Sequence, residues 1–396
     1  MSKHLVVDNG SYNIKAGFQG AEPLKVHNII SKTKDGAIYI GNEYLKQTNN
    51  YSGIIFRRPY DQGHLVSWET EKPVWDYMFD KFEFDASETH LTLTETPFQL
   101  PQLSINTDLI VFEEYGFSEY YRCIPASLVP WLGSDKSDYM LVIDSGFYAT
   151  WIIPVIYQKV YWKGVKKLPI GGKLLNGLLR ELISFRHYDI ADEPILINTI
   201  KEKTCFVAQD FNSALRKRNN YMTEFILPDF KTTTTGYVKT DSSKVPPDAQ
   251  SLRLLDERFT VPESFYHPEI IFDNNSTNSS LLQSTPMKNL VDLAVESIMS
   301  CPEVVRPLLS SNISVVGGTA CLPNFESRLL SELRRELPLD WCVKSISTDI
   351  PKDEAAWNGG LNLSSDEVIE KVSITKQDYF EHGANWCQKQ FGFKNL

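Results

Sequence analysis

The pattern that decides the fold occurs twice, as LVVDNGSYNIKAGF (5–18) and as LVIDSGFYATWIIP (141–154), with starts 136 residues apart. Each copy is an apolar strand that ends in an aspartate, Asp8 or Asp144, followed by a small-residue turn and a second strand. This pattern predicts a β-hairpin. Backbone N–H groups that converge in such a turn form an anion cradle, and the strand-end carboxylate can hold a hydrated Mg²⁺. Two cradles predict two related lobes that grip a phosphate chain, although either turn alone is equally typical of an ordinary hairpin.

Length and composition describe a globular protein with more than one core. A chain of 396 residues predicts two domains, and its 42% apolar and 23% charged residues are typical of folded proteins. The formal net charge of −10 argues against a surface that binds nucleic acid throughout, but leaves local basic patches open. The six cysteines include no C-x-x-C pair, which makes a zinc site or disulfide framework unexpected and favours a reducing compartment. Neither a signal peptide nor a membrane span is expected.

Strands alternate with helices along the chain, which predicts an α/β architecture. A leucine stripe predicts a helix that opens at Gly171-Gly172. Further helices are expected over 71–82, 118–132, 195–208, 287–299 and 322–336, and a buried strand over 313–316. The polar segment 231–250 is expected to be a loop, and whether it orders on binding is left open.

Three more features point to a nucleotide. Gly317-Gly318-Thr319 follows a strand and precedes a helix, where glycine lets the backbone approach a ligand closely; the alternative is a plain turn. Lys15 follows the first turn and is placed to reach outer phosphates as a point charge. Lys201 and Glu202 lie on the helix expected over 195–208, where a solvated helix face is the alternative interpretation.

These stretches together resemble the actin superfamily over nearly the whole chain. DNGSYNIKAGF and IDSGFYATWIIP are similar to its two phosphate loops, and IKEKTCFVAQDF is similar to the helix that contacts ribose and adenine. RFTVPESFYHP, SVVGGTACLPNFESR, AAWNGGLNLSS and TKQDYFEHG follow in actin order. One branch of the actin-related proteins has segments similar to FEEYGF, IGGKLLNGLLRELISF and FILPDFKT. Members of that branch are subunits of a nuclear chromatin remodeller that exchanges a histone variant into nucleosomes.

The resemblance implies an actin fold, with two lobes that each have a central mixed sheet flanked by helices. It also implies four subdomains around a nucleotide cleft. We predict subdomain 1 as 1–29, 59–134 and 355–396, a short subdomain 2 as 30–58, subdomain 3 as 135–170 and 272–354, and subdomain 4 as 171–271.

The resemblance further implies a set of cofactor-binding residues. They are Asp8, Gly10, Ser11, Lys15, Asp144, Ser145, Gly146, Lys201, Glu202, Gly317, Gly318 and Thr319. Asp8 and Asp144 would hold Mg through waters. The expected cofactor is ATP or ADP with Mg, held as a structural wedge and not turned over; the alternative is an empty cleft.

Departures from the actin pattern argue against hydrolysis. Actins have a Gln that orients the attacking water and a His that assists it; Pro125 and Trp151 occupy these positions here. Proline offers no side-chain donor or acceptor, and losing a water-orienting group costs about 10²–10⁴ in rate. We therefore expect no catalytic residue and no enzyme activity.

Comparison with actins also indicates weaker nucleotide binding, because several positions near the expected nucleotide differ from the actin pattern. Large side chains replace small turn residues, an acidic residue replaces the Lys that packs on adenine, and an aliphatic residue replaces a Tyr near the same ring. These residues are Tyr12, Phe147, Tyr148, Asp353 and Leu322.

The function expected from the resemblance is a non-catalytic structural subunit of that remodeller, in the nucleus and also in the cytoplasm. Its partners would be the motor subunit, a zinc-finger subunit and the nucleosome, with no membrane. Basic clusters that could touch nucleosomal DNA, or be solvated surface, are Arg57-Arg58, Lys163 with Lys166-Lys167, and Arg216-Lys217-Arg218. Filaments are not expected, because the span 29–39 is short and DNNSTNSS (273–280) has no apolar tip. The alternatives are a working actin-type ATPase that hydrolyses ATP or polymerises and, less favoured, a sugar kinase.

Overall fold

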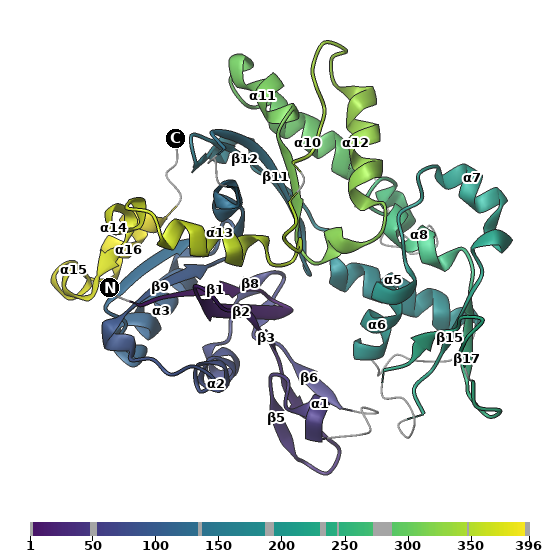
Figure 1. The fold of residues 1–396 in the computed structure, drawn as a ribbon, viewed down its shortest axis with the longest axis horizontal. Helices are drawn as coiled ribbons and strands as arrows, with labels where there is room; N and C mark the ends of the chain where they lie inside the picture. The colour runs from purple at the N-terminus through teal and green to yellow at the C-terminus, as the bar shows by residue number, and fades with distance from the viewer. Residues whose placement is uncertain are drawn as a thin grey trace, which may run out of the picture.

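The computed structural model describes residues 3–47, 54–133, 137–186, 194–229, 235–243, 245–271, 287–346 and 348–392. These residues form two lobes, each built on its own β-sheet with helices packed around it (Figure 1). The two-lobed α/β architecture expected from the sequence is confirmed. The division into four subdomains stays a prediction.

The first lobe is built on a six-stranded sheet. Its strands, in spatial order, are β19 (Ile374–Thr375), β10 (Glu119–Cys123), β9 (Thr89–Thr94), β1 (Lys3–Asn9), β2 (Asn13–Phe18) and β3 (Leu24–His27). β1 pairs antiparallel with β2 and parallel with β9. Because β1 lies inside the sheet, its run of Leu5, Val6 and Val7 is fully buried, as expected for a strand covered on both faces.

The second lobe repeats this arrangement around the second sequence copy. Its strands are β13 (Lys159–Val160), β12 (Thr150–Ile156), β11 (Tyr139–Ser145) and β18 (Ile313–Val316), with β14 (Lys166–Leu168) also paired to β12. β11 pairs antiparallel with β12 and parallel with β18, which matches the relation of β1 to β2 and β9. The two hairpins predicted from the sequence repeat are therefore present.

Smaller sheets extend both lobes. They are β5 (Ile38–Ile40), β4 (Ile30–Lys32) and β6 (Ile55–Arg57); β7 (Tyr60–Asp61) and β8 (His64–Leu65); and β16 (Tyr237–Val238), β15 (Thr223–Ile226) and β17 (Ser251–Leu254). β16 lies within the segment expected to be a loop.

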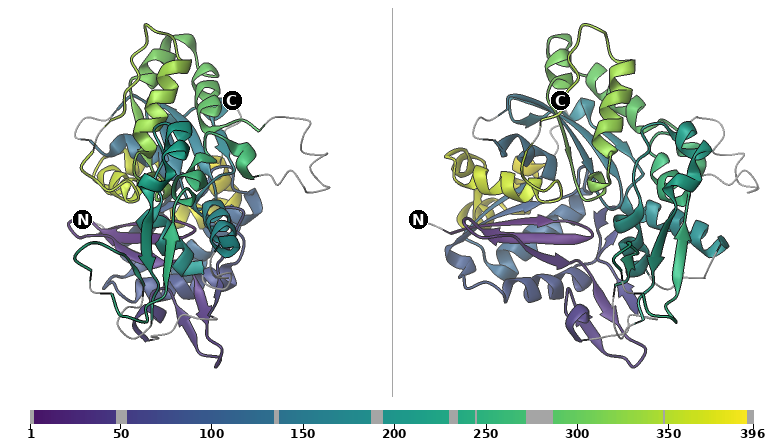
Figure 2. Two further views of the ribbon diagram at one scale, coloured as in Figure 1. Left: turned by 90° about the vertical axis from the view of Figure 1, so that its right-hand side faces the viewer. Right: turned by 45° about the vertical axis from the view of Figure 1, so that its right-hand side comes forward.

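Helices cover the sheets from several sides (Figure 2). Those of the N-terminal part are α1 (Tyr44–Gln47), α2 (Trp68–Phe79), α3 (Pro101–Leu109) with a π-helical turn (Ile110–Tyr115), and α4 (Pro125–Leu128). The middle of the chain contributes α5 (Gly172–Arg186), α6 (Pro194–Thr204), α7 (Phe211–Arg216) and α8 (Glu257–Glu263). The last part contributes α10 (Leu290–Met299), α11 (Arg306–Ser310), α12 (Phe325–Glu336), α13 (Ala355–Ser364), α14 (Val368–Val372), α15 (Lys376–His382) and α16 (Ala384–Phe391). Among the described residues, no helix combines the length and apolar character needed to cross a membrane.

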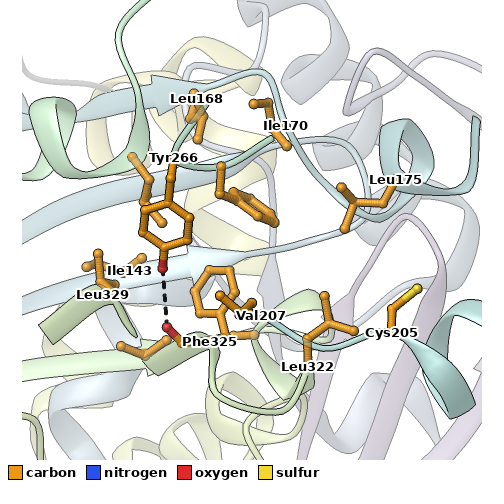
Figure 3. Packing of buried hydrophobic residues seen from close by; sticks show 14 of the residues in the cluster. Ile143, Leu168, Ile170, Leu175, Cys205, Val207, Tyr266, Leu322, Phe325 and Leu329 are labelled. Carbon is orange, nitrogen blue, oxygen red and sulfur yellow. Dashed lines mark hydrogen bonds between the residues drawn. The ribbon is translucent and has the colours of Figure 1, made fainter. Parts of the chain in front are cut away.

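The core of the second lobe reaches the edge of the space between the lobes. Figure 3 shows Ile143 of β11 and Leu168 of β14 in one cluster with Leu175 of α5 and Leu322. Burying each such side chain contributes about 1.5–3 kcal/mol. The core therefore fixes the glycine loop that precedes Leu322 against β11.

Helix α13 packs on the first lobe through two glycines that have no room for a side chain. A Cβ on Gly359 would lie 2.0 Å from the carbonyl oxygen of Leu128, and one on Gly360 would lie 2.6 Å from a methyl of Val6. The helix thus packs directly on α4 and β1, as Figure 1 shows in yellow against the purple strands.

The prediction of a helix over 118–132 is wrong. The segment is strand β10 followed by the short helix α4, which begins at Pro125. Gly116, at φ 76°, ends the preceding helical run, and side chains then alternate between buried and half-buried positions as a strand requires. Arg122 can lie inside because it pairs with Asp108, at 3.0 Å, and with Glu95.

Candidate functional site: a cleft between the two hairpins

A cleft of about 530 Å³ lies between the lobes and is lined by both hairpin turns. It gathers every residue predicted to bind the cofactor except Ser145. The Ser145 side chain is fully buried, and its hydroxyl lies 2.8 Å from that of Thr150 in the neighbouring strand. The fold therefore brings predicted residues from four separate chain segments into one site. Ser145 faces the sheet instead.

In the first hairpin, Asp8 has partners on both carboxylate oxygens. Lys15, directly opposite in the strand register, approaches Oδ2 at 3.1 Å, and the Thr94 hydroxyl donates to Oδ1 at 2.8 Å. Burial by itself lowers the pKa of Lys15, but the charge and hydrogen bond of Asp8 outweigh this and raise it above its ordinary value. Lys15 is thus a fixed cation at the floor of the cleft.

In the second hairpin, Asp144 has an apolar frame. Trp151 lies opposite it on β12 and Val316 beside it on β18. No residue that the structure describes donates a hydrogen bond to its carboxylate. Burial and, after it, the charge of Asp8 raise the pKa of Asp144 to about 7, while Lys15 acts in the opposite direction. A hydrated cation between Asp8 and Asp144 would relieve this, so the carboxylate pair fits the predicted Mg position.

The turn amides are less available than the sequence suggested. The N–H of Gly10 donates to the carbonyl of Asp8 at 2.9 Å, and that of Gly146 donates to the carbonyl of Ala149 at 3.0 Å. Each of these two glycine amides closes its own turn, so neither offers a free donor to the predicted cradle.

The far end of the cleft contains the residues expected to contact ribose and adenine. Lys201 is only 4% exposed, and its ammonium donates to the carbonyl of Gly172 at 3.2 Å and to Asn198 at 2.9 Å. Burial lowers its pKa to about 8. Asn198 also donates to Glu202 at 2.8 Å. Lys201 is therefore an interior cation, and a solvated helix face is the wrong interpretation for it.

The glycine loop closes tightly on the second hairpin. Gly317 has φ +96°, and a Cβ there would lie 2.4 Å from the carbonyl oxygen of Ser145. The Thr319 hydroxyl donates to the carbonyl of Gly146 at 2.8 Å. Only glycine meets both demands at 317, so the loop brings backbone to within contact of the Asp144 turn.

The two positions where actins orient the attacking water are occupied by side chains that cannot act as a base. Pro125 and Trp151 both line the cleft. Pro125 occupies the first turn of α4, where its missing N–H costs nothing. The indole of Trp151 lies under the Lys167 ammonium, which is 5.0 Å from the ring centroid. Neither side chain can accept a proton from a water.

The adenine side has also changed. Asp353 pairs with Lys25 at 2.9 Å, and Leu322 is packed into the core of the second lobe. Asp353 is therefore held by its own partner at the rim of the cleft.

Aromatic rings lie between the two turns, where a phosphate chain would pass. The ring centroids of Tyr12 and Phe147 are 4.8 Å apart. With these rings in contact and the two glycine amides engaged, the residues present do not fit a nucleoside di- or triphosphate that bridges the turns. The donor set at the Lys201 end is compatible with a nucleoside.

Sequence reasoning missed Thr94 and misplaced Arg58. Thr94 ends a strand of alternating Leu and Thr (LTLTET, 91–96), a pattern that could have indicated a hydroxyl at the sheet edge. The sequence places Arg58 in a cluster expected to touch DNA or to be solvated surface, but its guanidinium stacks 4.4 Å from the Tyr12 ring centroid inside the cleft wall.

The other basic clusters differ in what they offer. Lys166 pairs with Glu296 at 2.8 Å, and Lys167 covers Trp151. Arg216, Lys217 and Arg218 are all exposed at the end of α7. This last cluster is the most available basic surface of the three. The segment DNNSTNSS lies outside the described residues.

The sequence is similar to those of known proteins over nearly its whole length. The sequence model of the actin family matches residues 1–392. The chain is 66% identical to "Actin-like protein ARP6" of Debaryomyces hansenii, over 100% of this chain and 99% of that protein. Proteins of the same name are 55% identical in Candida albicans and 36% identical in Saccharomyces cerevisiae, each over 99% of this chain and 98% of its relative. The chain belongs to the actin family, in its actin-related protein 6 branch.

Proposed function

We propose that the chain is a non-catalytic structural subunit of a nuclear, ATP-dependent chromatin remodelling complex that exchanges a histone variant into nucleosomes. It would act as a rigid body on which partner subunits assemble. The proposal rests on membership of the actin-related protein 6 branch and on the state of the cleft. Its partners would be the motor subunit and a zinc-finger subunit, in the nucleus and also in the cytoplasm.

The observation that supports a non-catalytic role most directly is the pair Pro125 and Trp151. Both line the cleft, and neither offers a base or a water-orienting group. A working ATPase would need another residue to supply this function near the outer phosphate. The rings of Tyr12 and Phe147 instead meet between the two turns.

The competing function is an actin-type ATPase that hydrolyses ATP or polymerises. Asp8, Lys15 and Asp144, which this function would use for Mg and phosphate, are still grouped in the cleft. Asp8 is not free to accept a proton from the attacking water, because it is bound to Lys15 and Thr94, and the Asp144 carboxylate would be taken up by the hydrated Mg²⁺ that this function requires. We therefore rank this function second.

A scaffold role is tested in the assembled complex. Deleting the chain should release the motor-bound partners that depend on it and abolish histone exchange, and the full chain should restore both. Normal assembly and exchange without the chain would contradict the proposal.

Contact with nucleosomal DNA is tested separately through the exposed α7 cluster. The variant Arg216→Ala/Lys217→Ala/Arg218→Ala should weaken nucleosome binding by the complex and reduce its salt dependence, without loss of subunits. Lys239→Ala is the matched control, because Lys239 is a surface cation already paired with Glu224 at 2.7 Å. Equal binding by the two variants would exclude the α7 cluster as a DNA contact.

A further inference from the structure

The two hairpin turns touch each other across the cleft through side chains, and this contact joins the lobes. Tyr12 belongs to the turn between β1 and β2, and Phe147 to the turn between β11 and β12. Their rings are tilted by 49° with centroids 4.8 Å apart, which is within the range of favourable aromatic pairs. The contact lies at the point where the two predicted anion cradles face each other.

The half-buried guanidinium of Arg58 completes the contact. Arg58 lies 4.4 Å from the Tyr12 ring centroid and 5.0 Å from that of Phe147. It also donates to the carbonyl oxygens of Ser11 and Tyr12, each at 3.3 Å. Arg58 thus holds the first turn by hydrogen bonds and the second by its position over the Phe147 ring.

The charge state of this cluster suits stacking. Burial raises the pKa of Tyr12 to about 12, although Arg58 opposes the shift, so the phenol is neutral at physiological pH. Burial lowers the pKa of Arg58, while Tyr12 and the neighbouring Tyr148 raise it. A guanidinium remains charged under these conditions because its ordinary pKa is above 12. The stack therefore consists of two neutral rings and one cation.

The residue after Phe147 makes a second bond between the lobes. The Tyr148 hydroxyl donates to the carbonyl of Tyr60 at 2.7 Å, and the Tyr60 hydroxyl donates to the carbonyl of Asn9 at 2.7 Å. The Lys173 ammonium lies 4.6 Å from the Tyr148 ring centroid. The second turn is thereby fixed to the β7–β8 hairpin of the first lobe as well.

We infer that Tyr12, Phe147, Tyr148 and Arg58 form a cross-lobe clamp, which joins the turns where a phosphate chain would otherwise bridge them. The clamp links the two walls of the cleft, and nucleoside di- and triphosphates are excluded from the space between the turns. A phosphate chain could enter only if the Tyr12–Phe147 contact opened and Arg58 left the rings. This inference concerns the cleft alone and does not depend on membership of a complex.

Nucleotide binding by the purified full chain tests the exclusion. Equilibrium dialysis with radiolabelled Mg-ATP and Mg-ADP should detect no binding by the wild type at micromolar to millimolar nucleotide, and denatured protein should release none. The variant Tyr12→Gly/Phe147→Gly should gain saturable binding of both nucleotides. Stoichiometric nucleotide in the wild type would overturn the inference, as would a folded double variant that still binds nothing.

Closure of the lobes is tested by amide hydrogen exchange, which remains informative if the double variant does not fold. Phe147→Ala should increase exchange in both the β1–β2 turn and the β7–β8 hairpin, which lie in the other lobe. Phe185→Ala is the control, because that ring is 90% exposed on α5, far along the chain from the clamp. If Phe147→Ala leaves exchange in the first lobe as low as in the control, the clamp does not hold the lobes and the inference fails.

Discussion

The first and second hairpins share a backbone, yet their aspartates lie in opposite chemical surroundings. β1 and β2 place Lys15 opposite Asp8, whereas β11 and β12 place Trp151 opposite Asp144. The parallel neighbours differ in the same direction, because Thr94 hydrogen-bonds to Asp8 while β18 sets Val316 beside Asp144.

This contrast separates what the repeated pattern determines from what it does not. The strand–aspartate–turn sequence determines where each carboxylate lies. Residues on neighbouring strands determine whether that carboxylate has a partner for its charge. Thr94, for example, is at least 85 positions away from the hairpin residues that it contacts. One lobe thus contains a satisfied ion pair and the other a half-buried acid with a raised pKa.

The largest expected effect comes from removing the cation of the first hairpin. Lys15→Met should destabilise the fold by about 3–5 kcal/mol at pH 8, because Asp8 would remain buried without its ion pair. The free energy of unfolding in urea measures this. Lys25→Met, which breaks a half-exposed pair with Asp353, should cost less than about 1 kcal/mol. Equal losses in the two variants would mean that Lys15 does not compensate a buried charge.

The second hairpin should respond to pH through Asp144. Its pKa is about 7 in the folded state against an ordinary 3.8, so the folded protein binds this proton more tightly than the unfolded chain. Stability from this group is therefore present below about pH 4 and is lost as pH rises to about 7. At about 1.4 kcal/mol per pKa unit, the loss is on the order of 2–4 kcal/mol.

The Asp144→Asn variant isolates this contribution. Relative to the wild type, it should gain stability steadily between pH 4 and pH 8 in urea unfolding experiments. Parallel pH profiles for the two proteins would show that Asp144 titrates normally, and would contradict the apolar frame described for it.

The turns themselves should differ in their tolerance of a methyl group. A Cβ at Gly10 would lie 2.4 Å from the carbonyl oxygen of Asn13, whereas one at Gly146 would lie 3.6 Å from that of Ala149. Gly10→Ala should therefore cost about 1–3 kcal/mol, and Gly146→Ala less than about 1 kcal/mol. Thermal unfolding of both variants checks the order; a reversed order would rule out the difference in turn packing.

The smallest effect is expected at the parallel neighbours. Thr94→Val should cost about 1–2 kcal/mol, because Asp8 and the N–H of Asn9 both lose the Thr94 hydroxyl. Val316→Thr should instead offer Asp144 a donor and flatten the pH dependence described above. The comparison is weakened if Thr94→Val is neutral and Val316→Thr leaves the pH profile unchanged.

The sequence predicted the parts of the fold that depend on local pattern. Both hairpins follow from their apolar strands, and α5 follows from its leucine stripe, of which Leu175, Leu179 and Ile183 are fully buried. The helix prediction for residues 118–132 is wrong because β10 is stabilised by partners distant in sequence. Arg122 can be buried only where Asp108 and Glu95 pair with it. No local signal reports such an ion-pair network.

The site shows the same limit. The sequence identified the residues that line the cleft, since turns and glycine loops are local features. It did not indicate that the Tyr12 and Phe147 rings meet, because they come from separate lobes. It also could not show that Lys201, one charge on an amphipathic helix, is interior; that depends on Gly172 and Asn198 accepting its hydrogen bonds.

The most direct test of a non-catalytic actin-type body is single-turnover cleavage of γ-labelled Mg-ATP by the purified chain. We expect phosphate release not to exceed that of buffer alone, because Pro125 and Trp151 cannot activate water and the turns are bridged by side chains. Release at an actin-like rate that disappears in the Asp144→Ala variant would contradict it.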